Sequence, residues 1–132
     1  MAAGYASMNM MNEDAFNGLN AVGDAFRTAC KEVLKLTDTE GEVQGQLSIF
    51  SVTFKEPWLN DTPARGAVYR SSGMHQYMVQ NGFWMSPGMV GVCSTIMDLA
   101  DVDAFSETLK NGIVAIRAVS YTHLTLQTIL LV

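Results

Sequence analysis

The strongest constraint on the fold is a long amphipathic stripe near the start of the chain. Apolar or small side chains recur at steps of three or four positions, at Phe16, Leu19, Gly23, Phe26, Cys30 and Val33. Polar and charged side chains fill the intervening positions, as expected for an α-helix with one buried face. The preceding Asn12-Glu13-Asp14 is a favourable helix start, because its acids lie near the positive end of the helix dipole. We expect a helix at about 12–36 that needs a second layer to cover its apolar face.

A second stripe predicts a matching helix later in the chain. It consists of Val102, Phe105, Leu109, Ile113 and Ile116. Asp98 is its N-cap candidate and stands three residues before Asp101. The alternative interpretation of Asp98, Asp101 and Asp103 as cation ligands is weaker, because the run lacks the glycine and distal glutamate of a calcium loop.

The segment between the stripes has the patterns of strands and turns. Residues 42–54 (EVQGQLSIFSVTF) are rich in β-branched and aromatic residues around Gly45, which predicts a strand pair or one bent strand. The prolines that follow predict a loop over about 55–64. Four residues can then share a helix face that stops at Asn81-Gly82, namely Val68, Met74, Tyr77 and Met78.

Two short apolar runs, 83–85 and 90–93, flank Ser86-Pro87-Gly88 and indicate a hairpin. The expected element order is therefore α-β-β-α-β-β-α. It predicts an α+β fold in which a small antiparallel sheet packs on helices in two layers.

Composition limits the classes of function. The chain has 132 residues, of which 48% are hydrophobic and 16% are charged, and this fits one domain. Its net charge of −5 and scattered basic residues argue against nucleic acid as a partner. No apolar run is long enough to span a membrane, and the start lacks the basic region of a signal peptide. Cys30 and Cys93 stand far apart and are expected to be buried thiols, which favours the cytoplasm.

Both ends differ from the middle. Residues 1–11 (MAAGYASMNMM) carry no charged side chain, which is typical of a helix buried against another domain. Residues 119–132 (VSYTHLTLQTILLV) have an alternation that could be a strand. They also resemble the translated sequencing-adapter tail of environmental reading frames, so native sequence is expected to end near Ala118. The expected division is therefore 1–36, 37–118 and a non-native 119–132.

No catalytic constellation is visible in the residues themselves. His75 and His123 have no metal-ligand spacing around them, and most of the nine methionines lie in apolar context, which suits core packing better than soft-metal binding. Gly82, Gly88 and Gly91 do not lead from a strand into a helix, so they are not a phosphate loop. The lysines, Lys31, Lys35, Lys55 and Lys110, are expected to be solvated.

Several motifs in order resemble the C-terminal part of class III pyridoxal-phosphate aminotransferases, in particular the glutamate-1-semialdehyde 2,1-aminomutase-like subgroup. They are Leu19-Asn20-Ala21-x-Gly23-x-x-Phe26-Arg27, Gly45-x-x-Ser48-x-Phe50-x-Val52-x-Phe54, Asn81-Gly82-Phe83-Trp84-x-x-Pro87, Gly91-x-x-Ser94-Thr95 and Asp101-x-Asp103. The resemblance covers about 2–118. It implies that residues 1–36 lead from a missing large domain into a small C-terminal α/β domain.

The resemblance also implies a function. The family's Schiff-base lysine, pyridinium aspartate and phosphate cup lie upstream, so this chain is expected to have no catalytic centre and to bind no cofactor alone. It would contribute the domain that closes over the pocket for a small amino or keto acid, within a dimer. Pro87, Gly88 and Met89 are the candidates for the pocket wall. Met89 stands where the aminomutase has a glutamate, and neither Arg65 nor Arg70 is in the family's carboxylate-binding motif, which favours a general aminotransferase.

Two other functions remain open at this point. One is a free-standing α+β ligand-binding or interaction module without catalysis, against which the uncharged first helix argues. The other is a small hydrolase that uses Cys93 or Ser94 with His75, for which no motif is present.

Overall fold

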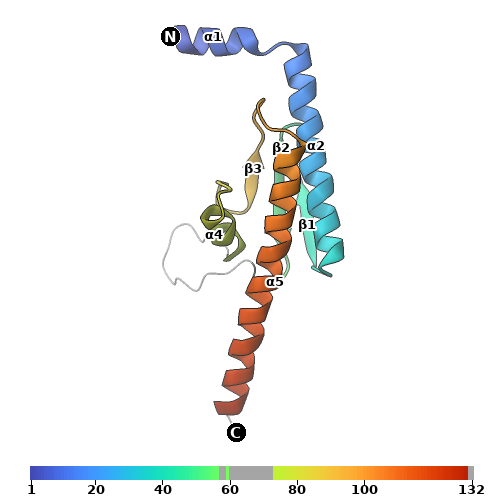
Figure 1. Cartoon of the computed structure of the whole chain (residues 1–132), viewed down its shortest axis with the longest axis vertical. Coiled ribbons are helices and arrows are strands. Elements are labelled where there is room, and N and C mark those ends of the chain that lie inside the picture. Colours follow the sequence, from blue (N-terminus) through green and yellow to red (C-terminus); the bar gives the residue numbers. More distant parts are fainter. Residues whose placement is uncertain (57–58, 60–72, 131–132) are drawn as a thin grey trace.

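The computed structural model describes residues 1–56, 59 and 73–130. Its helices are α1 (Ala2–Met10), α2 (Glu13–Leu36), α4 (Gly73–Gln80) and α5 (Leu99–Leu130). Its strands are β1 (Gly41–Gln44), β2 (Ile49–Phe54) and β3 (Val90–Val92). Figure 1 shows α2 and α5 running side by side across the sheet, with α4 on the far side of α5 from β1. The predicted α+β fold with an antiparallel sheet packed on helices is confirmed.

The sheet has the order β1-β2-β3, and both strand pairs are antiparallel. Val43 lies opposite Val52, and Phe50 lies opposite Gly91. The alternation along β2 buries Phe50, Val52 and Phe54 and leaves Ile49 and Thr53 exposed. One face of the sheet therefore carries the core, and the other is open to solvent.

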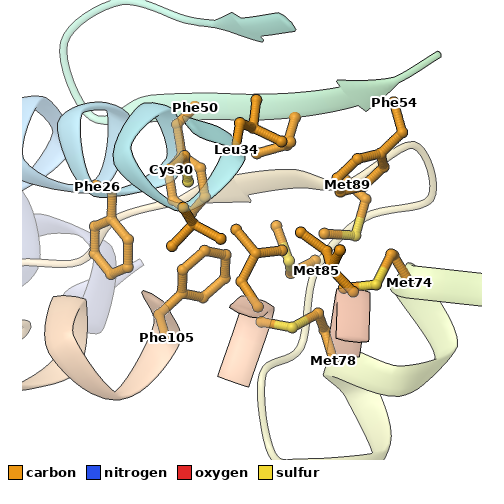
Figure 2. Packing of buried hydrophobic residues seen from close by; sticks show 14 of the residues in the cluster. Phe26, Cys30, Leu34, Phe50, Phe54, Met74, Met78, Met85, Met89 and Phe105 are labelled. Carbon is orange, nitrogen blue, oxygen red and sulfur yellow. The ribbon is translucent and has the colours of Figure 1, made fainter. Parts of the chain in front are cut away.

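The core gathers the apolar faces of α2, α4, α5 and the sheet (Figure 2). Aromatic side chains fill the end near the start of α5, where the Phe26 and Phe50 rings stack at 4.7 Å between centroids. At the other end Phe54 is joined by methionines from α4 and from the segment before β3: Met74, Met78, Met85 and Met89. The prediction that the methionines pack in the core is confirmed for these four.

The two long helices begin where the sequence predicts. The Asn12 side chain accepts a hydrogen bond from the Ala15 amide at 2.9 Å and caps α2. Asp98 Oδ1 accepts from the Ala100 and Asp101 amides, while Asp101 Oδ2 accepts from the Asp98 amide at 3.0 Å. This reciprocal arrangement is a capping box. It confirms the capping role of Asp98 and Asp101.

One member of the first stripe does not reach the core. The Phe16 side chain is 49% exposed, because the first turns of α2 extend past the end of the sheet (Figure 1). Buried positions begin at Gly23 and end with Leu34, which the predicted stripe did not include.

Helix α4 ends as predicted, but the hairpin after it differs. Gly82 has φ of +92°, the Phe83 amide donates to the Met78 carbonyl, and the Gly82 amide donates to that of Val79. These bonds form a Schellman stop. The predicted strand 83–85 is wrong, because only a single bridge joins Ser86 to Val90 and β3 pairs with β2 instead. The described sheet therefore has three strands rather than four.

The ends of the described chain are both helical. None of the residues of α1 is buried, and α1 leaves the start of α2 at a steep angle (Figure 1). Residues 119–130 continue α5, so their interpretation as a strand is wrong. A helix that is already nucleated propagates at low cost, which overrides the weak alternation of this segment. Residues 57–58 and 60–64 of the loop predicted at 55–64 lie outside the described residues, as do Val68, Arg65 and Arg70.

Candidate functional site

The predicted pocket residues lie on a tight turn that is anchored on both sides. The Ser86 amide donates to the Val90 carbonyl at 2.9 Å and closes the turn. Met85 before the turn and Met89 within it are buried in the core, at 5% and 1% exposure. Ser86, Pro87 and Gly88 between them are exposed. The turn is therefore held by two buried thioether side chains and presents its tip to solvent.

The backbone of the turn adopts an uncommon conformation. Gly88 and Met89 have φ values of +85° and +59°. A left-handed conformation costs glycine little, but it is unfavourable for a long side chain such as methionine. Burial of the Met89 side chain and the bond from the Val52 amide to the Met89 carbonyl, at 3.2 Å, hold it there. Residues held in such conformations cluster at functional sites.

A shallow hollow borders this turn. Its volume is about 380 Å³, and its walls are Trp84, Met85, Ser86, Pro87, Val90 and Val92. Pro87 therefore lines a surface cavity, and Gly88 lies next to it in the chain. Met89 does not line this hollow, because its side chain points into the core (Figure 2).

Arg27 ties α2 to the connection between β1 and β2. Its Nη1 donates to the Leu47 carbonyl at 2.8 Å and to the Ile49 carbonyl at 2.7 Å, and its Nη2 pairs with Asp24. This approach requires Gly23, because a Cβ there would overlap the Leu47 carbonyl oxygen. The Gly23 and Phe26-Arg27 motif is thus explained by packing of a helix on a hairpin.

Arg117 makes a similar connection from α5. It donates to the carbonyls of Thr37 and Asp38, to Thr39 Oγ1, and to both carboxylate oxygens of Glu56. The hydrogen bond with Glu56 is the main reason that the pKa of Arg117 is raised. Sequence patterns gave no indication of this residue because its partners lie about 60 to 80 positions away in the chain, and no local pattern marks such a contact.

The remaining candidate residues have structural roles. His75 Nε2 lies 2.9 Å from the Met85 carbonyl oxygen, so its ring supports the segment that leads into the turn. Cys30 and Cys93 are both buried free thiols, as predicted. Burial raises the pKa of Cys30 to about 12 and also raises that of Cys93, where the nearby charge of Arg27 opposes the effect. Such thiols are poor nucleophiles at neutral pH. Ser94 is exposed, and the side chain of His123 is outside the described set.

This fold occurs within transaminases. The chain superposes on an omega-transaminase from Sphaerobacter thermophilus with a TM-score of 0.72 and 21% identity, covering 87% of this chain and 27% of that one. It superposes on a transaminase with PLP (pyridoxal phosphate) bound with a TM-score of 0.69 and 19% identity, covering 87% of this chain and 26% of that one. The chain therefore spans about a quarter of the length of these transaminases and shares the fold of that part. No family model and no curated protein matches the sequence.

The residues present do not by themselves fit pyridoxal phosphate. That cofactor is held as a Schiff base on a lysine, with a partner for its pyridine nitrogen and donors for its phosphate. Lys31, Lys35, Lys55 and Lys110 are all exposed, and none lines the hollow beside the turn.

No helix among the described residues is long and apolar enough to cross a membrane.

Proposed function

We propose that this chain is part of a class III pyridoxal-phosphate-dependent aminotransferase and supplies the small domain that closes over the substrate pocket. The observation that carries the proposal is the superposition of 87% of the chain on about a quarter of an omega-transaminase. The ordered sequence motifs also support it, since they follow one another along about 2–118. The glutamate-1-semialdehyde aminomutase-like enzymes are the proposed subgroup.

In this proposal the exposed turn forms one wall of the substrate pocket. Pro87 and Gly88 stand clear of the core, while Met85 and Met89 fix the turn from beneath. A wall that is rigid before closure keeps water from the reacting centre without paying for loop ordering. Met89 acts through its backbone, because its side chain is buried. The missing glutamate and this burial favour a general aminotransferase over an aminomutase, acting on a small amino or keto acid.

The proposal also assigns the ends of the chain. Residues 1–36 lead from the large domain, which carries the lysine and the cofactor, and α1 packs against that domain. This assignment is supported by the complete exposure of α1, including the Tyr5, Met8 and Met10 side chains. Residues 119–132 are a non-native tail, the parent is a dimer, and the two reduced, buried cysteines suit the cytoplasm.

Two experiments test this function. Long-read sequencing of the source DNA across both ends should show in-frame upstream codons that include a strand-borne lysine, and different codons in place of 119–132. A stop codon directly before Met1 would refute the proposal and favour a free-standing module.

The second experiment uses the full reading frame. The Gly88→Ala variant should lose transaminase turnover, because alanine disfavours the φ of +85° at the pocket wall. Gly82→Ala is the matched control, since Gly82 has φ of +92° and equally open surroundings but ends α4 and does not line the hollow beside the turn. It should retain turnover at a similar loss of stability. Equal turnover in the two variants would show that the turn is not a pocket wall.

A further inference from the structure

A second hollow shares Trp84, Met85 and Val92 with the first but has a different character. Its volume is about 320 Å³, and it opens between the segment 82–85, β3 and the start of α5. That volume falls within the range of small-molecule sites, which begins at about 300 Å³. The hollow is formed by residues of this chain alone, so ligand binding in it is independent of the proposed function.

The floor of this hollow is aromatic. Phe26, Phe50, Phe83 and Phe105 all line it. The Phe105 ring stands edge-on to the other three, with centroid separations of 5.3 to 5.4 Å. Phe26, Phe50 and Phe105 are almost wholly buried and form the base of the hollow. The half-buried Phe83 and the exposed Trp84 offer accessible rings, against which a planar ring can pack by stacking or edge-to-face contact.

The rim leaves apolar surface uncovered. The Trp84 side chain is 86% exposed and that of Val92 is 62% exposed, while Met97 is half-buried. All three line the hollow. A ligand seated between them would remove this surface from water and gain free energy roughly in proportion to the area covered.

The wall contains one charged side chain, Asp101. The capping box fixes its carboxylate, because Oδ2 accepts from the Asp98 amide at 3.0 Å. A carboxylate has about four acceptor positions, so it can accept a further hydrogen bond from a ligand. The other lining side chains are uncharged. The Asp101 carboxylate would repel an anionic ligand, whereas a neutral N–H or O–H group can donate to it.

We propose that this hollow binds a small planar aromatic molecule that carries one neutral hydrogen-bond donor at its edge, of the indole or phenol class. The ring packs on the aromatic floor beneath Trp84, and its donor group faces the Asp101 carboxylate.

The test measures binding of indole and of N-methylindole to the full chain by calorimetry. Indole should bind saturably and shift the amide resonances of Gly82 and Gly91, which line the hollow. N-methylindole should bind about fivefold more weakly, because it lacks the donor. The difference should vanish in Asp101→Ala and persist in Asp103→Ala, a neighbouring residue that does not line the hollow.

Trp84→Ala should weaken indole binding by about tenfold, since aromatic anchors dominate such contacts. Ile96→Ala is the matched control, because Ile96 is 90% exposed and lies outside the hollow. It should bind as the unmodified chain does. The proposal is overturned if a chain with the expected helical circular dichroism shows no saturable binding. It is also overturned if Trp84→Ala binds as tightly as Ile96→Ala, or if the two indoles bind equally.

Discussion

Replacing Gly23 by alanine should destabilise the protein, although the same replacement at Gly18 in the same helix should stabilise it. Both glycines lie within α2. Alanine is the better helix former at either position by about 1 kcal/mol. At Gly18 nothing lies within 4 Å of an added Cβ, so this gain should be retained.

At Gly23 the added Cβ overlaps the Leu47 carbonyl oxygen and lies 2.9 Å from its carbonyl carbon and 3.0 Å from Ser48 Cα. These are backbone atoms, so the β1–β2 turn must move away from α2. That movement lengthens the Arg27 hydrogen bonds to the Leu47 and Ile49 carbonyls, and bonds to a charged group contribute about 1.5–3 kcal/mol each. Overpacking typically costs about 1–3 kcal/mol. Overpacking and the weakened Arg27 bonds together should cost about 3 kcal/mol. After the helix gain of about 1 kcal/mol is subtracted, we expect a net loss of about 2 kcal/mol in the free energy of unfolding.

Urea denaturation followed by circular dichroism measures both effects on one scale. Gly23→Ala should lower the midpoint, and Gly18→Ala should raise it by the equivalent of about 1 kcal/mol or less. Gly23→Ala should be less stable than the unmodified protein and Gly18→Ala more stable, so their free energies of unfolding should differ by about 3 kcal/mol. If both variants are stabilised alike, α2 does not approach the hairpin as described and the reasoning fails.

Three further predictions concern single side chains. Arg117→Met leaves the Glu56 carboxylate without this donor, so the free energy of unfolding should fall by about 2 kcal/mol in urea denaturation; an unchanged midpoint would contradict this. Because burial raises the pKa of Cys30 from 9.0 to about 12, the unfolded thiol ionises first as pH rises. The stability of the unmodified protein relative to Cys30→Val should be constant below pH 9 and fall between pH 9 and pH 12. A constant difference between the urea midpoints of the two proteins across this pH range would refute the prediction. Asp98→Ala removes the α5 cap and should cost about 1 kcal/mol, whereas the exposed Asp103→Ala should stay within about 0.5 kcal/mol; equal thermal midpoints would count against the capping box.

The candidate site was only partly predictable. Pro87 and Gly88 were expected in a turn because proline and glycine have local backbone preferences, and the turn is where they lie. The burial of Met89 was not predictable, because it depends on which way a left-handed backbone aims the side chain relative to α4 and β2. The contacts of Arg27 and Arg117 were missed for the same reason, since each joins segments that are remote in the sequence.

The sequence by itself determined the span of α2 and the start of α5. The predicted span of 12–36 differs by one residue from Glu13–Leu36, and both predicted caps, Asn12 and Asp98, make the expected hydrogen bonds. Helical periodicity and capping act between residues within one or two turns, so they are readable locally.

The tertiary structure decided which segments pair as strands of the sheet. Residues 83–85 have the composition of a strand, yet the Met85 carbonyl lies against His75 and β3 takes the place beside β2. A strand forms only where a partner offers its backbone groups, and that partner is set by the packing of α4 and α5 on the sheet. Local patterns therefore specified the helices, while long-range contacts specified the edge of the sheet and the turn beside it.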